Sequence, residues 1–226
     1  MTSITYLFHL TSGQSHKISL SFDPVTFDLQ VPPAPMDQDT HWTQLDFHKC
    51  PHCPLAADPQ AQCPFARALS GFIQNFDAYY SYEKAVVEVT TDNRTIVSRH
   101  ALQEGMASIL GLVGATSGCP HLNFYRPMAR FHLPFASEQE TLFRVFTTHL
   151  FAEYLRSMET GQPVSLDTLH ERAQAVAKVN AAMAGRIRAA FKKDAVVNAI
   201  IILDTFAQAV PWIIDKGLKE LRPLFR

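Results

Sequence analysis

The sequence predicts an α+β fold, with antiparallel strands and hairpins near the N-terminus and buried helices in the C-terminal half. Apolar and polar residues alternate in 4–30 and again in 84–100, as they do in half-buried strands. From residue 137 onward the apolar residues recur at every third or fourth position, which is the spacing of amphipathic helices. The chain has no internal repeat and no coiled-coil register, so we expect one domain over residues 1–226.

Residues 1–48 are expected to form a β-meander. The segments "ITYLFHL" and "HKISLSF" flank the turn "TSGQS", and "TFDLQV" follows the break "DPV". The stretch "VPPAPMDQDTH", residues 31–41, is rich in proline and lacks periodicity, so it predicts a connector. We expect "WTQLDFH" to be a further short strand and residues 49–66 to be a cysteine-rich loop.

The region 67–136 predicts a mixture of helices and a hairpin, and it carries the Cys119 loop. A helix is expected to begin just before this region with Cys63 as its N-cap, because Pro64 at the first helical position loses no hydrogen bond there. The segment "KAVVEVTTDNRTIVSRH" alternates around the turn "TDN" and indicates a β-hairpin. "ALQEGMASILGLV" then indicates a short buried helix, and an irregular segment rich in Gly and Pro follows it.

Residues 137–226 are expected to form part of a helical bundle. The sequence "SEQE" fits a capping box, in which Ser137 and Glu140 pair with the first free backbone N–H groups. Asp194 is expected to cap a later helix. The apolar stripe of the first helix consists of Leu142, Phe146, Leu150 and Tyr154. The stripe of the second consists of Leu169, Ala173, Val176, Asn180, Met183, Ile187 and Phe191.

One apolar run, "AVVNAIIILDTFAQAVPWII" at residues 195–214, is long enough to span a membrane. It contains Asn198, Asp204, Gln208 and Pro211, and such groups are unfavourable in a bilayer core. We therefore expect a buried helix and no membrane association.

The charge and the N-terminus narrow the class of protein. The 226 residues carry a formal net charge of −1, which provides no global attraction to nucleic acid or to an anionic membrane. The N-terminus lacks the basic region and the cleavage site of a signal peptide, so we expect a cytoplasmic protein. Thiols stay reduced in that compartment, which favours metal-binding or catalytic roles for the four cysteines.

The cysteine spacing predicts a metal site. Cys50 and Cys53 have the C-x2-C spacing that lets two sulfurs reach one tetrahedral ion, and Cys63 follows at a helix start that favours a thiolate. Cys119 is expected to supply the fourth sulfur, with His121 as the substitute ligand. Zinc is the expected ion because it prefers a closed tetrahedral thiolate site, and an iron–sulfur cluster with the same ligand count is less favoured.

Other roles for the cysteines stay open. "CPHC" at 50–53 is the dithiol sequence of oxidising thioredoxin-like enzymes, but Pro54 would fall where it cannot donate the first bond of the required helix. Cys119 could act as a nucleophile with His121 or His132 as its base. Some cysteines could also be small buried hydrophobic residues without a ligand.

Taken together, "CPHCPL", "QCPFA", "TSGCPHL", "RPMARFHLPFA", "SEQETLFRV" and "DAVVNAIIILD" resemble, in this order, an uncharacterised bacterial family, a domain of unknown function. The resemblance runs from about residue 44 to 210 and is weaker in the N-terminal strands. It implies no activity, ligand or fold. It does imply that the cysteine-proline pairs and "FHLPFA" are features of the family, which favours a shared site.

Five further residues are candidates for a ligand pocket. Arg126 and His132 lie near the last cysteine, and a guanidinium beside a histidine suits an anionic group. His132 can equally be a core histidine. Asn180, Asp194 and Asn198 lie on apolar helical faces, where buried polar groups must find partners. They either hold two helices in register or line a small-molecule pocket.

The sequence favours a soluble protein with a structural zinc site that serves as a binding or regulatory module. Its partner would be an unknown protein or small molecule, and a homodimer stays open. If the metal keeps an open position near Cys119, Arg126 and His132, the protein is instead a metal-dependent enzyme. In a third hypothesis, a cytosolic thiol redox sensor, oxidation ejects the metal and pairs Cys50 with Cys53.

Overall fold

Four strands and six α-helices make up the part of the chain that this computed structural model describes, which is residues 2–31, 40–56, 58, 61–215, 219 and 222–225. The strands are β1 (Thr2–Leu10), β2 (Ser15–Phe22), β3 (Lys84–Thr90) and β4 (Thr95–Ala101). The α-helices are α1 (Pro64–Ser70), α2 (Leu102–Thr116), α3 (Arg126–Arg130), α4 (Glu138–Thr160), α5 (Asp167–Ala190) and α6 (Ala195–Asp215). The 3-10 helices are η1 (His41–Thr43), η2 (Ile73–Phe76), η3 (Asn123–Tyr125) and η4 (Arg222–Phe225). The predicted α+β fold is confirmed.

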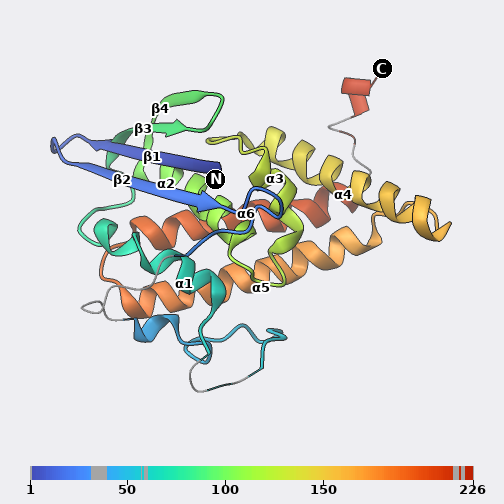
Figure 1. The fold of residues 1–226 in the computed structure, drawn as a ribbon, viewed down its shortest axis with the longest axis horizontal. Coiled ribbons are helices and arrows are strands. Elements are labelled where there is room, and N and C mark those ends of the chain that lie inside the picture. The colour runs from blue at the N-terminus through green and yellow to red at the C-terminus, as the bar shows by residue number, and fades with distance from the viewer. Residues whose placement is uncertain are drawn as a thin grey trace.

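The strands form one antiparallel sheet in the order β2-β1-β3-β4. Alternation along the strands buries one face of this sheet, where Tyr6, Phe8 and Val87 lie. Helix α2 packs against that face (Figure 1). An added Cβ at Gly105 would lie 3.0 Å from the side chains of both Phe8 and Val87, so glycine lets α2 approach the sheet this closely.

Helix α2 is the central layer of the molecule. It contacts α6 on the side away from the sheet, and α6 in turn packs along α5 (Figure 1). Its apolar residues Leu102, Met106, Ile109 and Leu110 are fully buried, as the sequence predicts. One core cluster runs from the sheet through α2 to α5 and α6.

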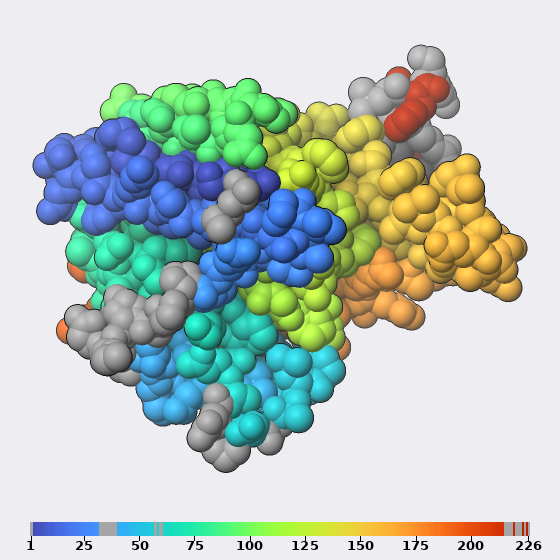
Figure 2. Space-filling model, in the orientation of Figure 1, coloured from blue at the N-terminus to red at the C-terminus, as the bar shows by residue number. Residues whose placement is uncertain are grey.

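Helix α4 begins as predicted and then leaves the core. The Ser137 hydroxyl accepts from the Glu140 N–H (3.3 Å) and the Glu140 carboxylate accepts from the Ser137 N–H (2.8 Å), which confirms the capping box. Leu142 is buried, but Leu150 is 37% and Tyr154 53% exposed, so the predicted stripe is wrong for the outer half. The face that this half buries carries His149 and Glu153 instead, and the half projects from the body of the molecule (Figure 2).

Two segments predicted as strands are not strands. In "TFDLQV", the Asp23 carboxylate accepts from the N–H groups of Val25 and Thr26, and this turn leaves only a single bridge to Leu29. "WTQLDFH" contains the 3-10 helix η1 and one bridge from Gln44. The predicted connector 31–41 lies mostly outside the described residues, since 32–39 are not among them.

Helix α6 is long and apolar enough to cross a membrane over Ala195–Ile214, by length and composition alone. About a third of this stretch, 33%, is buried against the rest of the protein, and core helices of soluble proteins pass the same test. Its first turns carry the buried residues Val196, Ala199 and Ile200, which pack in the main core. The expected buried helix is therefore seen in its N-terminal half, while Trp212 near its end is 54% exposed.

Candidate functional site

Four cysteines from three separate segments meet at one small cavity. Cys50 and Cys53 lie on the loop after η1, Cys63 is the N-cap of α1, and Cys119 follows α2. All four line a cavity of about 20 Å³, and all four are free thiols. The structure thus brings together the four residues that the sequence analysis selects as metal ligands.

Short backbone hydrogen bonds position the first three of these residues. The Cys53 N–H donates to the Cys50 carbonyl (3.0 Å) and closes the turn of the C-x2-C pair. The Cys63 N–H donates to the Thr43 carbonyl (2.8 Å), which ties the start of α1 to η1. Each of the four cysteines is followed by a proline, whose fixed φ stiffens the backbone next to the sulfur.

Burial and repulsion from neighbouring cysteines raise the pKa of two of these thiols, Cys50 and Cys119. The pKa of Cys50 is raised to about 12, first by burial and then by the charges of the other three cysteines. The charge of Arg186 acts in the opposite direction and lowers it. Burial also raises the pKa of Cys119, although the nearby backbone N–H groups of His121 and Leu122 lower it. Four thiolates can therefore share this cavity only if a cation balances their charge.

A buried arginine lies beside the thiols. Arg186 of α5 is only 2% exposed, and burial lowers its pKa while the cysteine charges raise it. The sequence analysis missed this residue, although a charged side chain next to the buried Ile187 is unusual on an apolar helix face. Its guanidinium donates to the backbone carbonyls of Trp42, Gln44 (2.6 Å) and Leu45 (3.2 Å).

Two histidines fasten the cysteine loops to α5 and to each other. His121, the predicted substitute ligand, lines the cavity, but its Nε2 donates to the His52 carbonyl (3.0 Å). The ring centroids of His52 and His121 are 4.1 Å apart, and the Nε2 of His52 donates to the Ala175 carbonyl (3.0 Å). Burial, and then the charge of His121, lower the pKa of His52, so its ring stays neutral. In this arrangement the Nε2 of His121 does not face an ion.

Within the described part of the chain, no three His, Cys, Asp or Glu side chains form a ready-made metal-binding group. The four thiols line the same cavity, and neighbouring cysteines raise the pKa of Cys50 and of Cys119, but the thiols do not form such a group. Protonated thiols have no reason to converge, because they gain neither charge balance nor coordination.

Three of the five residues predicted for a ligand pocket have structural partners instead. Arg126 pairs with Asp28, with 2.9 Å between the guanidinium Nη2 and the carboxylate. The Asp194 carboxylate accepts from the N–H (2.9 Å) and the hydroxyl (3.0 Å) of Ser81, and from the amide of Asn198 (3.1 Å). Asp194 and Asn198 therefore hold the start of α6 against the segment before β3. No side-chain cap from Asp194 onto α6 is seen among the hydrogen bonds of the described residues.

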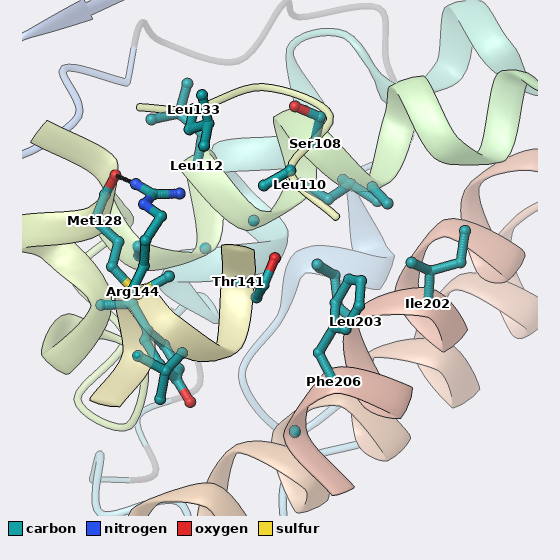
Figure 3. Close-up of a pocket in the computed structure, with 18 of the residues that line it drawn as sticks. Ser108, Leu110, Leu112, Met128, Leu133, Thr141, Arg144, Ile202, Leu203 and Phe206 are labelled. Carbon is teal, nitrogen blue, oxygen red and sulfur yellow. Dashed lines mark hydrogen bonds between the residues drawn. The ribbon is translucent and has the colours of Figure 1, made fainter. Parts of the chain in front are cut away.

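The other two, His132 and Asn180, line a second cavity of about 630 Å³. This cavity lies between α2, α4 and α6 and the segment that contains α3 (Figure 3). Its wall is mainly apolar, and it borders the thiol site because Phe65 lines both cavities. The structure thus separates His132 from Cys119, which lines only the small cavity.

An uncharged chain of hydrogen bonds reaches the wall of the large cavity. The Tyr6 hydroxyl lies 2.8 Å from the Ser108 Oγ and 2.5 Å from the His132 Nε2. Burial, and then the charge of Arg144, lower the pKa of His132 to about 3, and burial raises the pKa of Tyr6 well above its usual range. Both rings are therefore neutral near pH 7. The sequence analysis missed Tyr6 and Ser108, because each has the pattern of an ordinary core position.

Comparisons with known proteins identify the family of this chain, but that family has no assigned activity. No curated protein and no solved structure matches it. The model of a domain of unknown function, DUF6901, matches residues 4–226, which is nearly the whole chain. The chain therefore belongs to the family of this domain, in agreement with the resemblance to an uncharacterised family.

Proposed function

We propose that the chain binds one zinc ion through Cys50, Cys53, Cys63 and Cys119, and that this closed site is structural. The protein would then be a soluble, cytoplasmic binding or regulatory module rather than a zinc enzyme. The observation that carries this proposal is that four free thiols from three separate segments line one cavity. Cysteines used merely as small core residues have no reason to gather in this way.

The electrostatics of the cavity support a bound cation. The charges of the neighbouring cysteines raise the pKa of Cys50 and of Cys119 because thiolates repel, and a divalent cation would reverse that repulsion. Arg186 adds a fixed positive charge, and the backbone N–H groups of His121 and Leu122 lower the pKa of Cys119. These groups would stabilise a thiolate-rich centre whose net charge is negative even with the ion bound.

The size of the cavity supports a single ion over a cluster. At about 20 Å³ it has room for roughly one water-sized body. A single zinc ion, with sulfurs about 2.3 Å away, suits a space of this size. An iron–sulfur cluster contains several iron and sulfide atoms and would require the segments to move apart.

The surroundings of Cys119 favour a structural site over a catalytic one. A catalytic zinc site keeps an open position next to groups that bind or protonate a substrate. Arg126, which the enzyme hypothesis needs there, is paired with Asp28, and His132 lines the other cavity. A closed site with four thiolates would instead tie the loop with Cys50 and the loop with Cys119 to the start of α1, where Cys63 lies.

The test is metal analysis of protein purified without a His-tag and without chelators. Inductively coupled plasma mass spectrometry should find about one zinc per chain, because a tetrahedral thiolate site binds one ion. Cys63→Ser and Cys119→Ser should each lose most of this zinc. His121→Ala should keep it, since the Nε2 of His121 is bonded to a carbonyl.

Cobalt substitution counts the thiolates independently. Thiolate-to-cobalt absorption in the near ultraviolet should match four sulfurs in the wild type and in His121→Ala. Loss of metal in His121→Ala, with Cys119→Ser unaffected, would instead make His121 the fourth ligand. Purified protein with no metal and four titratable thiols would refute the zinc proposal, and iron with sulfide would favour the cluster.

A further inference from the structure

A second site follows from the large cavity, which is distinct from the thiol site. Its volume of about 630 Å³ lies within the range of small-molecule sites. Leu203 and Phe206 project into it from α6, toward the side where Thr141 of α4 lies (Figure 3). Residues of α2, α4, α6 and the segment that contains α3 thus surround one space.

Most of the wall is apolar. Leu110 and Leu112 from α2 and Ile202, Leu203 and Phe206 from α6 all line it. Apolar walls of this extent gain free energy when an apolar molecule replaces water. The occupant is therefore expected to be largely apolar.

Asn180 is a polar residue in the mainly apolar inner wall. It lies on α5, it is only 3% exposed, and it lines the cavity. Within the described residues its side-chain amide has no hydrogen-bond partner. A buried amide is normally paired, so this one is placed to bond a polar group of the occupant.

The charges around the cavity argue against an anion. The lining contains two carboxylates, Glu104 and Glu138, and one guanidinium, Arg144. The Nη2 of Arg144 already donates to the carbonyls of Met128 (2.6 Å) and Phe131 (2.9 Å). The polar groups deeper in the wall, Asn180 and the Ser108–Tyr6–His132 chain, are uncharged. An anionic head group would meet two carboxylates and only one guanidinium in the described lining.

We propose that this cavity binds a neutral, largely apolar molecule that carries one hydrogen-bonding group, with that group on Asn180. A long-chain alcohol is the simplest member of this class. The site does not depend on the zinc ligands, because none of the four cysteines lines it. The two proposals can therefore fail separately.

The test is a displacement assay on the full chain as purified, with the neutral dye N-phenyl-1-naphthylamine. The dye should fluoresce when the protein is added, and 1-decanol should displace it. Decanoate, of the same chain length, should need about a tenfold higher concentration, because a charge is costly to bury without a partner. Better displacement by decanoate would overturn the neutral class of ligand.

A cavity-filling variant locates the dye. An added Cβ at Gly111 would lie 3.5 Å from the Leu203 side chain, so Gly111→Leu should fill the cavity. It should weaken dye binding about tenfold, since its side chain takes the place of about four ligand atoms. The matched control is Gly71→Leu, because an added Cβ there meets nothing within 4 Å. Equal binding by both variants would place the dye elsewhere and overturn the site.

Two further variants complete the test. Asn180→Leu should weaken 1-decanol about fivefold, which is the size of one lost neutral hydrogen bond. An unchanged affinity would remove Asn180 from the proposal. If Gly111→Leu does not fold, Ala207→Leu fills the same cavity from α6 and is read against Gly71→Leu in the same way. No fluorescence with folded wild-type protein would refute the site.

Discussion

The small thiol cavity and the large apolar cavity are neighbours with opposite chemistry. Phe65 lines both, and the loop after α2 serves both, with Cys119 on the small cavity and Leu122 on the large one. In the small cavity, ionisable groups face one another and their charge has to be balanced. In the large cavity, burial holds the His132 ring of the wall neutral. If both proposals hold, charge distinguishes the occupants of the two cavities before shape does.

The largest expected effect on stability comes from the thiol cavity, through removal of the proposed zinc ion. Removing zinc with a strong chelator should lower the free energy of unfolding by on the order of 5 kcal/mol, because the ion joins three segments of the chain. The midpoint of thermal unfolding should fall by roughly 10 °C or more. Differential scanning fluorimetry with and without chelator measures this shift, and added zinc should restore it. An unchanged midpoint on chelation, in protein shown to contain zinc, would make the metal dispensable for the fold.

The next effect tests whether Arg186 belongs to the small site. Arg186→Leu should cost about 3 kcal/mol, because three buried carbonyls lose their donor. The matched control is Arg188→Leu on the same helix, where the side chain is exposed and the cost should stay within about 0.5 kcal/mol. Urea denaturation of both variants supplies the comparison. Similar costs for the two variants would mean that Arg186 is not an anchor of the cysteine loop.

The smallest effect concerns the neutral wall of the large cavity. The pKa of His132 is about 3 when folded and near 6.5 when unfolded, so below pH 6.5 only the unfolded chain takes up this proton. The contribution of the neutral His132 to the free energy of unfolding is thus fully present above about pH 7, and it declines as the pH falls toward 3. Between pH 7 and pH 5, protonation of His132 in the unfolded chain should lower the free energy of unfolding of the wild type by about 2 kcal/mol.

His132→Gln separates this effect from the rest of the protein. Glutamine keeps an acceptor for the Tyr6 hydroxyl but has no proton to gain in this range. The variant should therefore lose less stability than the wild type between pH 7 and pH 5, as measured by urea denaturation. Equal losses in the two proteins would show that His132 is not held neutral by burial.

Local patterns predicted much of the fold because their partners are close in sequence. The capping box of Ser137 and Glu140 and the hairpin of β3 and β4 depend on contacts within a few residues, and both are seen. The predicted apolar stripe of α4 is wrong in the outer half of the helix. The apolar spacing continues there, although the hydrophobic core does not. "TFDLQV" failed because the Asp23 carboxylate forms a turn that competes with a strand.

The candidate sites divide in the same way. The four cysteines could be selected from the sequence, because a C-x2-C pair has a known chemical use at that spacing. Arg186 could not, because its partners Trp42 and Leu45 lie on a loop more than a hundred residues earlier. Tyr6 and His132 likewise meet only after β1, α2 and the segment after α3 have packed together.

By itself, the sequence determined the α+β class, the helix starts at Pro64 and Glu138, and the set of thiols that could hold an ion. These depend on spacing and on residue type, which are properties of short stretches of chain. Only the tertiary structure decided that those thiols share one cavity and that His132 and Asn180 belong to another. The physical reason is that a cavity exists only between elements that have packed, and its charge balance depends on residues brought together from distant parts of the chain.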